Sequence, residues 1–389
     1  MAQRRKRREK RVVHFFDYTL LLLVLFLLLF GLVVLYSVSS YEANIKFGDG
    51  AYYLKKQIIA TALGLVGMIF ATVIDYHVWN KLALWVYIFS LATVCLIPTS
   101  LGREYNGARR WLEIGGVSVQ PAEIVKLGVI IFVAALITGI GRGIKNRKAF
   151  GVIVGVAAVP TLMIFLITRN MSSAIIIFGI AAVMLFMADP KYLRYIGLVL
   201  LVIVIAVFAV LIIQKKAESR QGEGTGDFRQ SRVLAWMNPE AYASDDSFQT
   251  LQGLYAIGSG GLFGKGLGES IQKMQLPEAQ NDMVFSIICE ELGVFGGLCL
   301  IALFGLLLQR CLIVASNAPD TFGALLVVGV MGHLALQVIL NIAVVTNTIP
   351  NTGVTLPFIS YGGTSVIFLL AEIGLVLNVS LRTRVTERV

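Results

Sequence analysis

Apolar residues in this chain fall into long runs that contain few charges. A membrane hydrocarbon core about 30 Å thick is crossed by about 20 consecutive apolar residues in a helix. Ten runs approach that length, at 16–38, 57–74, 82–98, 122–140, 150–168, 173–188, 196–213, 284–308, 322–345 and 364–381. The pattern therefore predicts an all-α polytopic membrane protein with about ten transmembrane helices.

The positions of lysine and arginine predict the orientation of these helices, because cytoplasmic loops carry more of them than external loops do. With the N-terminus inside, the cytoplasmic segments carry 18 Lys and Arg residues and the short outer loops carry 7. We therefore expect both termini to be cytoplasmic. One long extracellular loop, at about 214–282, is expected between helices 7 and 8.

Composition agrees with a membrane protein. Hydrophobic residues make up 57% of the chain and charged residues 14%, whereas a soluble domain carries about 25% charged residues. The net charge is +10, and eight of these charges lie on two basic tails, 1–14 and 382–389. The tails orient the chain, so the charge does not indicate a nucleic-acid partner. Between them we expect one membrane domain, 15–381.

Two outer loops carry residues that a simple linker would not need. The loop before the fourth predicted helix contains Arg109, Arg110 and Trp111. In that helix Glu123 and Lys126 are three residues apart and therefore share one face. Ionisable groups within a span are costly and usually pair inside the protein. The two interpretations are a structural ion pair that fixes helix packing and a pair that lines a polar cavity open to the outer leaflet.

The long outer loop ends in a glycine-rich segment that is followed by an acid. Residues 256–268 include six glycines and Lys265, and glycine permits close backbone approach to a ligand. Asp282 stands where the eighth helix enters the membrane, and partial desolvation there would favour proton uptake by a general base. The simpler interpretation is a helix cap. Glu290 and Glu291 lie two turns further on, and at least one of them should face inward.

The last two predicted helices also carry polar residues. His333, Gln337 and Asn341 form a polar stripe at i, i+4 and i+8, which must face other helices rather than lipid. Interhelical hydrogen bonding is the simplest explanation of this stripe. Glu372 is a buried acid with no partner evident in the sequence. The loop 356–365 mixes turn residues with aromatic ones, which suggests a re-entrant segment that lines the same cavity.

These motifs together resemble the SEDS family of polytopic bacterial membrane proteins, which includes FtsW and RodA. The resemblance extends from about residue 15 to 385 and preserves the order of the family's motifs. The motifs that carry it are Gly107–Leu112, Gln120–Lys126, Ala256–Gly268, Leu276–Asp282, Glu290–Gly293 and Leu356–Ser365. The stretch Gly266–Lys273 looks more like the division-type FtsW branch than the elongation-type RodA branch.

The resemblance implies a peptidoglycan glycosyltransferase that polymerises lipid II on the outer face of the bacterial cytoplasmic membrane. It implies a divalent cation, Mg²⁺ or Mn²⁺, whose ligands it does not assign. It also implies a class B penicillin-binding protein as transpeptidase partner, together with other division proteins and membrane lipids. We accordingly expect a location at the division septum.

The resemblance also assigns roles to particular residues. The essential acid of the family corresponds to Asp282, which would be the catalytic base. The substrate-binding candidates are Arg109, Arg110, Trp111, Glu123, Lys126 and Lys265. One departure concerns the turn between the fifth and sixth helices, where the family usually has a Pro-Asp-x-Gly-Thr-like motif and this chain has Arg169–Ser173. The role of the family's acid in that turn does not transfer to this chain.

Three alternative functions are compatible with the same residues. A lipid II flippase would use intramembrane charges such as Glu123, Lys126 and Glu372 along a translocation path. An elongation-type RodA role in lateral wall synthesis would use the same chemistry at another place in the cell. A scaffold that recruits the division machinery through the basic tail would need no catalytic residue.

Overall fold

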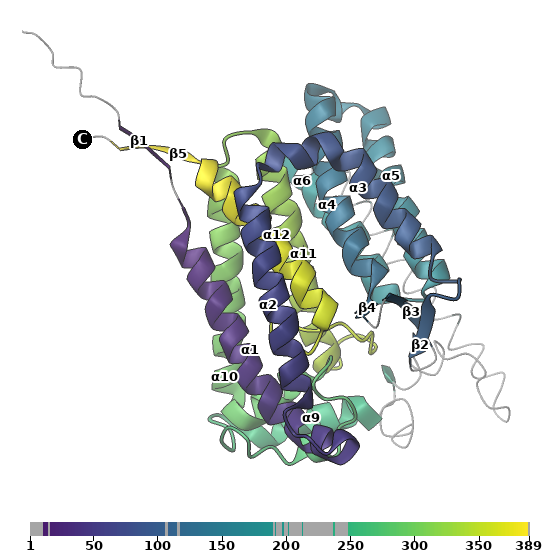
Figure 1. Ribbon diagram of the computed structural model, residues 1–389, viewed down its shortest axis with the longest axis vertical. Helices are drawn as coiled ribbons and strands as arrows, with labels where there is room; N and C mark the ends of the chain where they lie inside the picture. Colours follow the sequence, from purple (N-terminus) through teal and green to yellow (C-terminus); the bar gives the residue numbers. More distant parts are fainter. Residues whose placement is uncertain are drawn as a thin grey trace, which may run out of the picture.

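The computed structural model describes residues 11–14, 16–105, 108–114, 117–189, 191, 197, 201, 212, 236–237 and 248–387. Most of them are helical (Figure 1). The helices are α1 (Tyr18–Phe47), α2 (Tyr52–Val73), α3 (Tyr76–Cys95), α4 (Pro121–Ile140), α5 (Arg147–Ile167), α6 (Met171–Ala188), α9 (Phe248–Gly260), α10 (Val284–Ser316), α11 (Thr321–Val345) and α12 (Gly363–Arg382), with 3-10 turns η1 (Gly141–Lys145) and η2 (Gln272–Met274). The strands are β1 (Arg11–His14), β2 (Gly102–Tyr105), β3 (Ala108–Ile114), β4 (Val117–Val119) and β5 (Arg384–Glu387).

Nine helices in the described part of the chain are long and apolar enough to cross a membrane. They correspond to nine of the ten predicted spans, so the prediction of an all-α polytopic fold is confirmed. The predicted seventh span, 196–213, lies outside the described residues. The first helix continues to Phe47, well beyond the predicted end at residue 38. Its start is fixed by Asp17, whose carboxylate accepts from the backbone N–H of Leu20 at 2.9 Å.

Both described ends of the chain lie at one end of the helix bundle (Figure 1). There β1 pairs with β5 in an antiparallel ladder, and Arg310 near the end of α10 binds Asp17 at 2.7 Å. We call this the inner end. The opposite, outer end carries α9 and the three-stranded sheet β2–β3–β4. The described end segments 11–14 and 384–387 therefore lie on one side of the bundle, and the cytoplasmic location of both termini stays a prediction.

Helix α10 is broken at Gly293, where φ is 73° and ψ is −177°. The sequence predicted one continuous span over 284–308, so that prediction is wrong in this detail. A Cβ at Gly293 would lie 2.3 Å from the carbonyl oxygen of Leu262, so only glycine allows this close approach. We call residues 284–292 the outer segment of α10 and residues 294–316 its spanning segment.

The connection between α11 and α12 folds back into the bundle, as the prediction of a re-entrant segment requires. Its residue Phe358 has a positive φ of 64° and packs against the middle of α1. A Cβ at Gly31 would lie 2.3 Å from the carbonyl oxygen of Phe358, so this glycine admits the loop. Gln57 of α2 accepts from the backbone N–H of Gly362 at 3.3 Å. We call residues 346–362 the re-entrant loop.

Candidate functional site at the outer end

Asp282 lies at the outer end of the bundle, immediately before the outer segment of α10, and is 8% exposed. Its carboxylate accepts a hydrogen bond from the side-chain amide of Gln249 on α9 at 3.1 Å. The backbone carbonyl of Asp282 accepts from the side chain of Asn341 on α11 at 2.8 Å. The helix-cap interpretation is wrong, because the N-cap residue of α10 is Met283 and no side chain caps this end. The Asp282 carboxylate therefore does not serve as the N-cap of α10.

The re-entrant loop completes the surroundings of Asp282. Its residue Asn351 donates to the side-chain oxygen of Gln249 at 3.0 Å. A Cβ at Gly353 would lie 3.9 Å from the Asp282 carboxylate, so the loop backbone passes close to that group. Asn341 also donates to the carbonyl of Val354 at 2.7 Å. α9, α11 and the re-entrant loop thus converge on Asp282, with α9 bonded to its carboxylate and α11 to its backbone carbonyl.

The re-entrant loop is also tied directly to the residues before Asp282. The backbone N–H of Tyr361 donates to the carbonyl of Gln280 at 2.8 Å. The side chain of Tyr361 packs edge-on against Tyr53 of α2, with ring centroids 5.1 Å apart. Burial raises the pKa of the Tyr361 hydroxyl, so this group stays protonated at neutral pH. Tyr361 therefore acts here as a packing residue and not as a charged one.

The polar stripe on α11 is buried, as predicted, and most of its contacts are interhelical or to the loop. Gln337 donates to the carbonyl of Thr355 in the re-entrant loop at 3.0 Å. His333 lies deeper and pairs with Glu372 of α12 at 2.8 Å, and both side chains are fully enclosed. The partner of Glu372 was not evident in the sequence, because 39 residues separate the two.

Glu123 and Lys126 form the ion pair that their spacing predicts, at 2.7 Å near the outer end of α4. Both residues are buried. Ser365 at the start of α12 donates to the second oxygen of Glu123 at 3.4 Å. The pair therefore joins α4 to α12, which is the structural role considered for it. Among the described contacts, none joins this pair to Asp282.

Arg109, Arg110 and Trp111 lie on β3 in the sheet at the outer end. Arg110 donates to the backbone carbonyls of Thr168 and Arg169, at 3.4 Å each. Arg109 is exposed and donates to the carbonyl of Pro98 at 3.2 Å. Trp111 is half-buried. The structure thus brings Arg110 against the turn between α5 and α6.

The turn between α5 and α6 links the sheet to the loop beside Asp282. Asn170 caps α6 by accepting from the backbone N–H of Ser173 at 3.0 Å. Ser172 donates to the carbonyl of Thr352 in the re-entrant loop at 2.7 Å. The residues that stand in place of the family's acidic motif therefore serve as a helix cap and as a tie to the loop.

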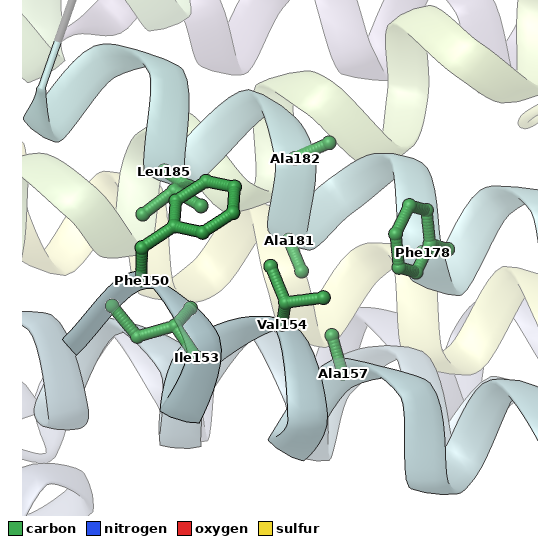
Figure 2. A pocket seen from close by; sticks show the side chains of 8 residues that line it. All are labelled: Phe150, Ile153, Val154, Ala157, Phe178, Ala181, Ala182 and Leu185. Carbon is green, nitrogen blue, oxygen red and sulfur yellow. The ribbon is translucent and has the colours of Figure 1, made fainter. Parts of the chain in front are cut away.

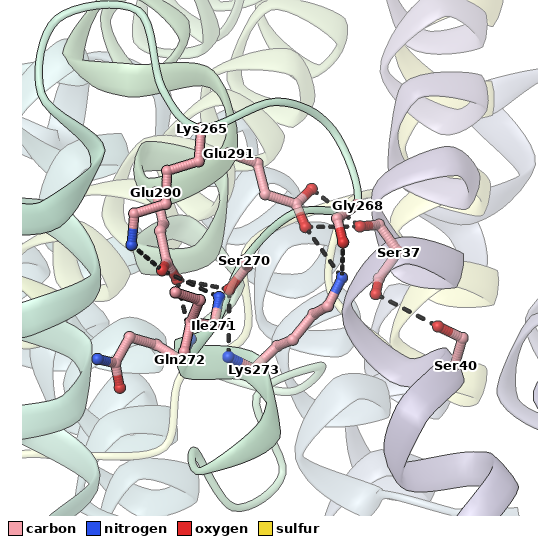
Figure 3. Close-up of polar contacts among 10 residues, drawn as sticks. All are labelled: Ser37, Ser40, Lys265, Gly268, Ser270, Ile271, Gln272, Lys273, Glu290 and Glu291. Atoms are coloured by element: carbon pink, nitrogen blue, oxygen red, sulfur yellow. Dashed lines mark hydrogen bonds and ion pairs between the residues drawn. The ribbon is translucent and has the colours of Figure 1, made fainter.

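Glu290 and Glu291, the two buried glutamates of α10, form a polar network with Lys265 and Lys273 of the preceding loop (Figure 3). Glu290 accepts from Lys265 at 2.7 Å and from the backbone N–H of Ile271 at 3.1 Å. Glu291 accepts from Ser37 of α1 at 2.7 Å and pairs with Lys273 at 3.4 Å. Both glutamates face inward, as expected. The ammonium of Lys265 is neutralised by Glu290, and its predicted role in substrate binding stays a prediction.

An apolar pocket between α5 and α6 is separate from these groups (Figure 2). It opens between the first half of α5 and the second half of α6, towards the inner end. Its lining carries no ionisable side chain and consists of Phe150, Ile153, Val154, Ala157, Phe178, Ala181, Ala182 and Leu185. The candidate site is therefore the polar cluster around Asp282 and not this pocket.

The fold and the site define a class: a polytopic membrane protein that holds a buried carboxylate at one end, between α9, α11 and a re-entrant loop. Within that class the chain belongs to the FtsW/RodA/SpoVE family. Residues 18–385 match the family described as "Cell cycle protein", so the resemblance noted from the motifs is confirmed.

Similar proteins cover nearly the whole chain. Stage V sporulation protein E of Bacillus subtilis (strain 168) is 36% identical over 95% of this chain and 98% of its own. A protein named "Probable peptidoglycan glycosyltransferase FtsW" from Trichlorobacter lovleyi is 35% identical, over 94% of this chain and 93% of its own.

Solved structures share the fold. One, described as "Structural coordination of polymerization and crosslinking by a peptidoglycan synthase complex", has a TM-score of 0.73 at 26% identity and covers 94% of this chain and 97% of its own. The rod shape determining protein RodA of Thermus thermophilus has a TM-score of 0.67 at 26% identity, with 94% of this chain and 96% of its own covered.

Proposed function

We propose that this chain is a peptidoglycan glycosyltransferase that polymerises lipid II on the outer face of the bacterial cytoplasmic membrane. The observation that carries the proposal is the placement of Asp282, a nearly buried carboxylate at the outer end that accepts from Gln249 and is tied to α11. The family relatives named as peptidoglycan glycosyltransferases support the assignment of the reaction.

Asp282 serves as the general base in this proposal. Its carboxylate takes the proton of the acceptor sugar's 4-hydroxyl while that oxygen attacks the anomeric carbon of the donor. The bond from the anomeric carbon to the lipid pyrophosphate breaks, and the pyrophosphate leaves with its negative charge. Arg109 and Arg110 at the outer end, with Lys126, are the cationic residues that would stabilise this charge. This reaction needs only one essential acid.

We propose that Asp282 binds a divalent cation together with the pyrophosphate of the substrate. The described residues contain no group of three His, Cys, Asp or Glu side chains able to hold a metal ion. Mg²⁺ is commonly bound by one or two carboxylates together with substrate phosphates and water. Asp282 and the pyrophosphate oxygens therefore fit such an ion, Mg²⁺ or Mn²⁺, which would help to neutralise the leaving group.

The test uses the purified full chain with its class B penicillin-binding protein partner, lipid II and either cation. Replacement of Asp282 by Asn should abolish glycan strands on a gel. The matched control is Glu269→Gln, which changes an exposed acid of the same outer loop and should polymerise normally. Normal strand synthesis by Asp282→Asn would overturn the assignment of the base.

We further propose that the reaction serves septal wall synthesis and is coordinated with a class B penicillin-binding protein. The support is the number of relatives named FtsW and the similarity to a synthase complex described as coordinating polymerisation with crosslinking. A fluorescent fusion should gather at the division septum. An even distribution along the lateral wall would favour the RodA role instead.

Lipid II flipping is the second candidate, and buried ionisable pairs within the membrane domain favour it. Glu123 with Lys126 and His333 with Glu372 are enclosed among the helices, and such groups often mark translocation paths. Lipid II that crosses protein-containing liposomes in the absence of glycan strands would support the flippase. Strands that disappear with Asp282→Asn would support the polymerase.

A further inference from the structure

Two large apolar side chains at the outer end point away from the protein. Leu262 is 70% exposed and Phe263 is 81% exposed, directly after α9. Exposed apolar patches of this kind mark contacts with another surface rather than with water. We call these two residues the apolar tip.

The apolar tip is rigidly attached to the break in α10. The backbone N–H of Val294 donates to the carbonyl of Gly261 at 3.0 Å, and that of Phe295 donates to the carbonyl of Leu262 at 3.1 Å. These bonds supply partners for the first N–H groups of the spanning segment, which have none within their own helix. The absence of a side chain at Gly293 lets the two backbones touch. The tip therefore moves with α10.

The attachment also sets the depth of the tip. The spanning segment, 294–316, is about 34 Å long at 1.5 Å per residue, which matches a hydrocarbon core about 30 Å thick. Its first residues therefore lie at the outer boundary of that core. Phe295 is 63% exposed and Leu298 is 59% exposed, so they form the lipid-facing side of the helix at this level. The apolar tip extends this lipid-facing side of α10.

We propose that Leu262 and Phe263 insert into the outer leaflet and thereby hold Asp282 at a fixed position relative to the membrane surface. The outer segment of α10 lies between the tip and Asp282 and is about 14 Å long. This inference rests on the proposed function, since a lipid-linked pyrophosphate sits at the headgroup level where the base must meet it. Lipid is the occupant because the tip is continuous with the lipid face of α10, and apolar and aromatic side chains favour this zone.

The test measures depth directly by spin labelling of the full chain in bilayers of phosphatidylethanolamine and phosphatidylglycerol. The four native cysteines are first replaced by serine, and single cysteines are introduced as Phe263→Cys, Phe295→Cys and Glu269→Cys. Oxygen reaches labels in lipid, and a water-soluble nickel chelate reaches labels in water. Phe295→Cys reports the lipid face, and Glu269→Cys reports an exposed position on the same loop.

The label at residue 263 should match the one at residue 295, with high oxygen and low nickel accessibility. A label that nickel reaches as readily as at residue 269 would overturn the proposal. So would a label shielded from both reagents only when the penicillin-binding protein is present, because the tip would then be a protein contact.

A second experiment tests whether the apolar tip fixes the depth of Asp282, which we call the depth role. The double variant Leu262→Ser with Phe263→Ser should slow polymerisation of lipid II in bilayers by about fivefold or more, because small displacements of a catalytic group are costly. Its thermal unfolding should stay near that of the parent chain. An unchanged rate would overturn the depth role. The accessibility result stands even for a chain with no polymerase activity, so the two proposals fail separately.

Discussion

Gln249 presents an N–H, and not an oxygen, to the Asp282 carboxylate. The side-chain nitrogen of Gln249 lies 3.1 Å from the carboxylate, while its oxygen accepts from Asn351 at 3.0 Å. The bond from Asn351 selects this orientation of the amide, because only its oxygen accepts. A donated hydrogen bond stabilises a carboxylate in its charged form, which is the form that a base requires. The hydrogen bond from Asn351 to Gln249 thus positions the N–H that Gln249 donates to Asp282. We call these two hydrogen bonds the positioning device.

Removal of this device should slow the reaction without unfolding the protein. The change Gln249→Leu leaves Asp282 without this donor, and a hydrogen bond to a charged group contributes about 1.5–3 kcal/mol. We therefore expect the turnover of lipid II to fall by at least about tenfold, with a smaller change in KM. The rate of strand formation on gels measures this.

The matched control for that prediction lies on the same helix. Gln252→Leu introduces the same side chain at a half-buried position of α9, one for which no contact with Asp282 is recorded among the described residues. Its turnover should stay within about twofold of the parent, as for a site remote from the chemistry. Equal losses in both variants would show that α9 as a whole, and not the contact with Asp282, sets the rate.

Asn341 should contribute to both stability and activity. Its amide satisfies two buried carbonyls, those of Asp282 and Val354. The change Asn341→Leu removes this donor from both carbonyls, at a cost of about 1–3 kcal/mol for each buried group. Thermal unfolding in detergent should shift clearly downward and turnover should fall. Asn317→Leu at the inner end is the comparison, and a similar shift there would argue against the specific role of Asn341.

The apolar runs predicted the nine spans found in the described residues, because an apolar run of about 20 residues is long enough to cross a bilayer as a helix. The pairing of Glu123 with Lys126 was equally accessible, since three residues along a helix place two side chains on one face. The general position of Asp282 at the outer end followed from counting spans. These features depend only on local spacing.

Other features depend on tertiary contacts and left no local signal. Gln249 is one of several polar residues in a long loop, and only the fold selects it as the partner of Asp282. Glu372 meets His333 because two helices pack together. Gly293 lies inside an apolar run whose pattern predicts one continuous helix, and its positive φ accompanies a close approach of the Leu262 backbone that the sequence does not reveal.

The pair Glu123 and Lys126 offers a way to separate a structural role from substrate binding. Lys126→Met leaves Glu123 buried and unpaired, which should cost about 3–5 kcal/mol of stability. Addition of Glu123→Gln removes the remaining charge and should recover much of that loss. Unfolding measurements on the single and double variants test this.

The activity of the same double variant decides between the two roles. If the pair only joins α4 to α12, the stable double variant should polymerise lipid II at a rate near that of the parent. If Lys126 stabilises the departing pyrophosphate, the double variant should lose polymerisation even though its stability has recovered. A single variant as stable as the parent would contradict the pair's structural role.

The break in α10 should be intolerant of any side chain. Gly293→Ala places a Cβ 2.3 Å from the carbonyl oxygen of Leu262 and forces a non-glycine residue to a φ of 73°, and that strain alone costs about 1–3 kcal/mol. Thermal unfolding should shift sharply downward, and the displaced outer segment should lower turnover as well. Gly305→Ala is the matched control, because it lies in the same helix and its Cβ meets nothing within 4 Å. That variant should unfold at the parent temperature or slightly above it, since alanine favours a helix by about 1 kcal/mol over glycine. Equal behaviour of the two variants would mean that the close contact between Leu262 and Gly293 does not hold the outer segment in place.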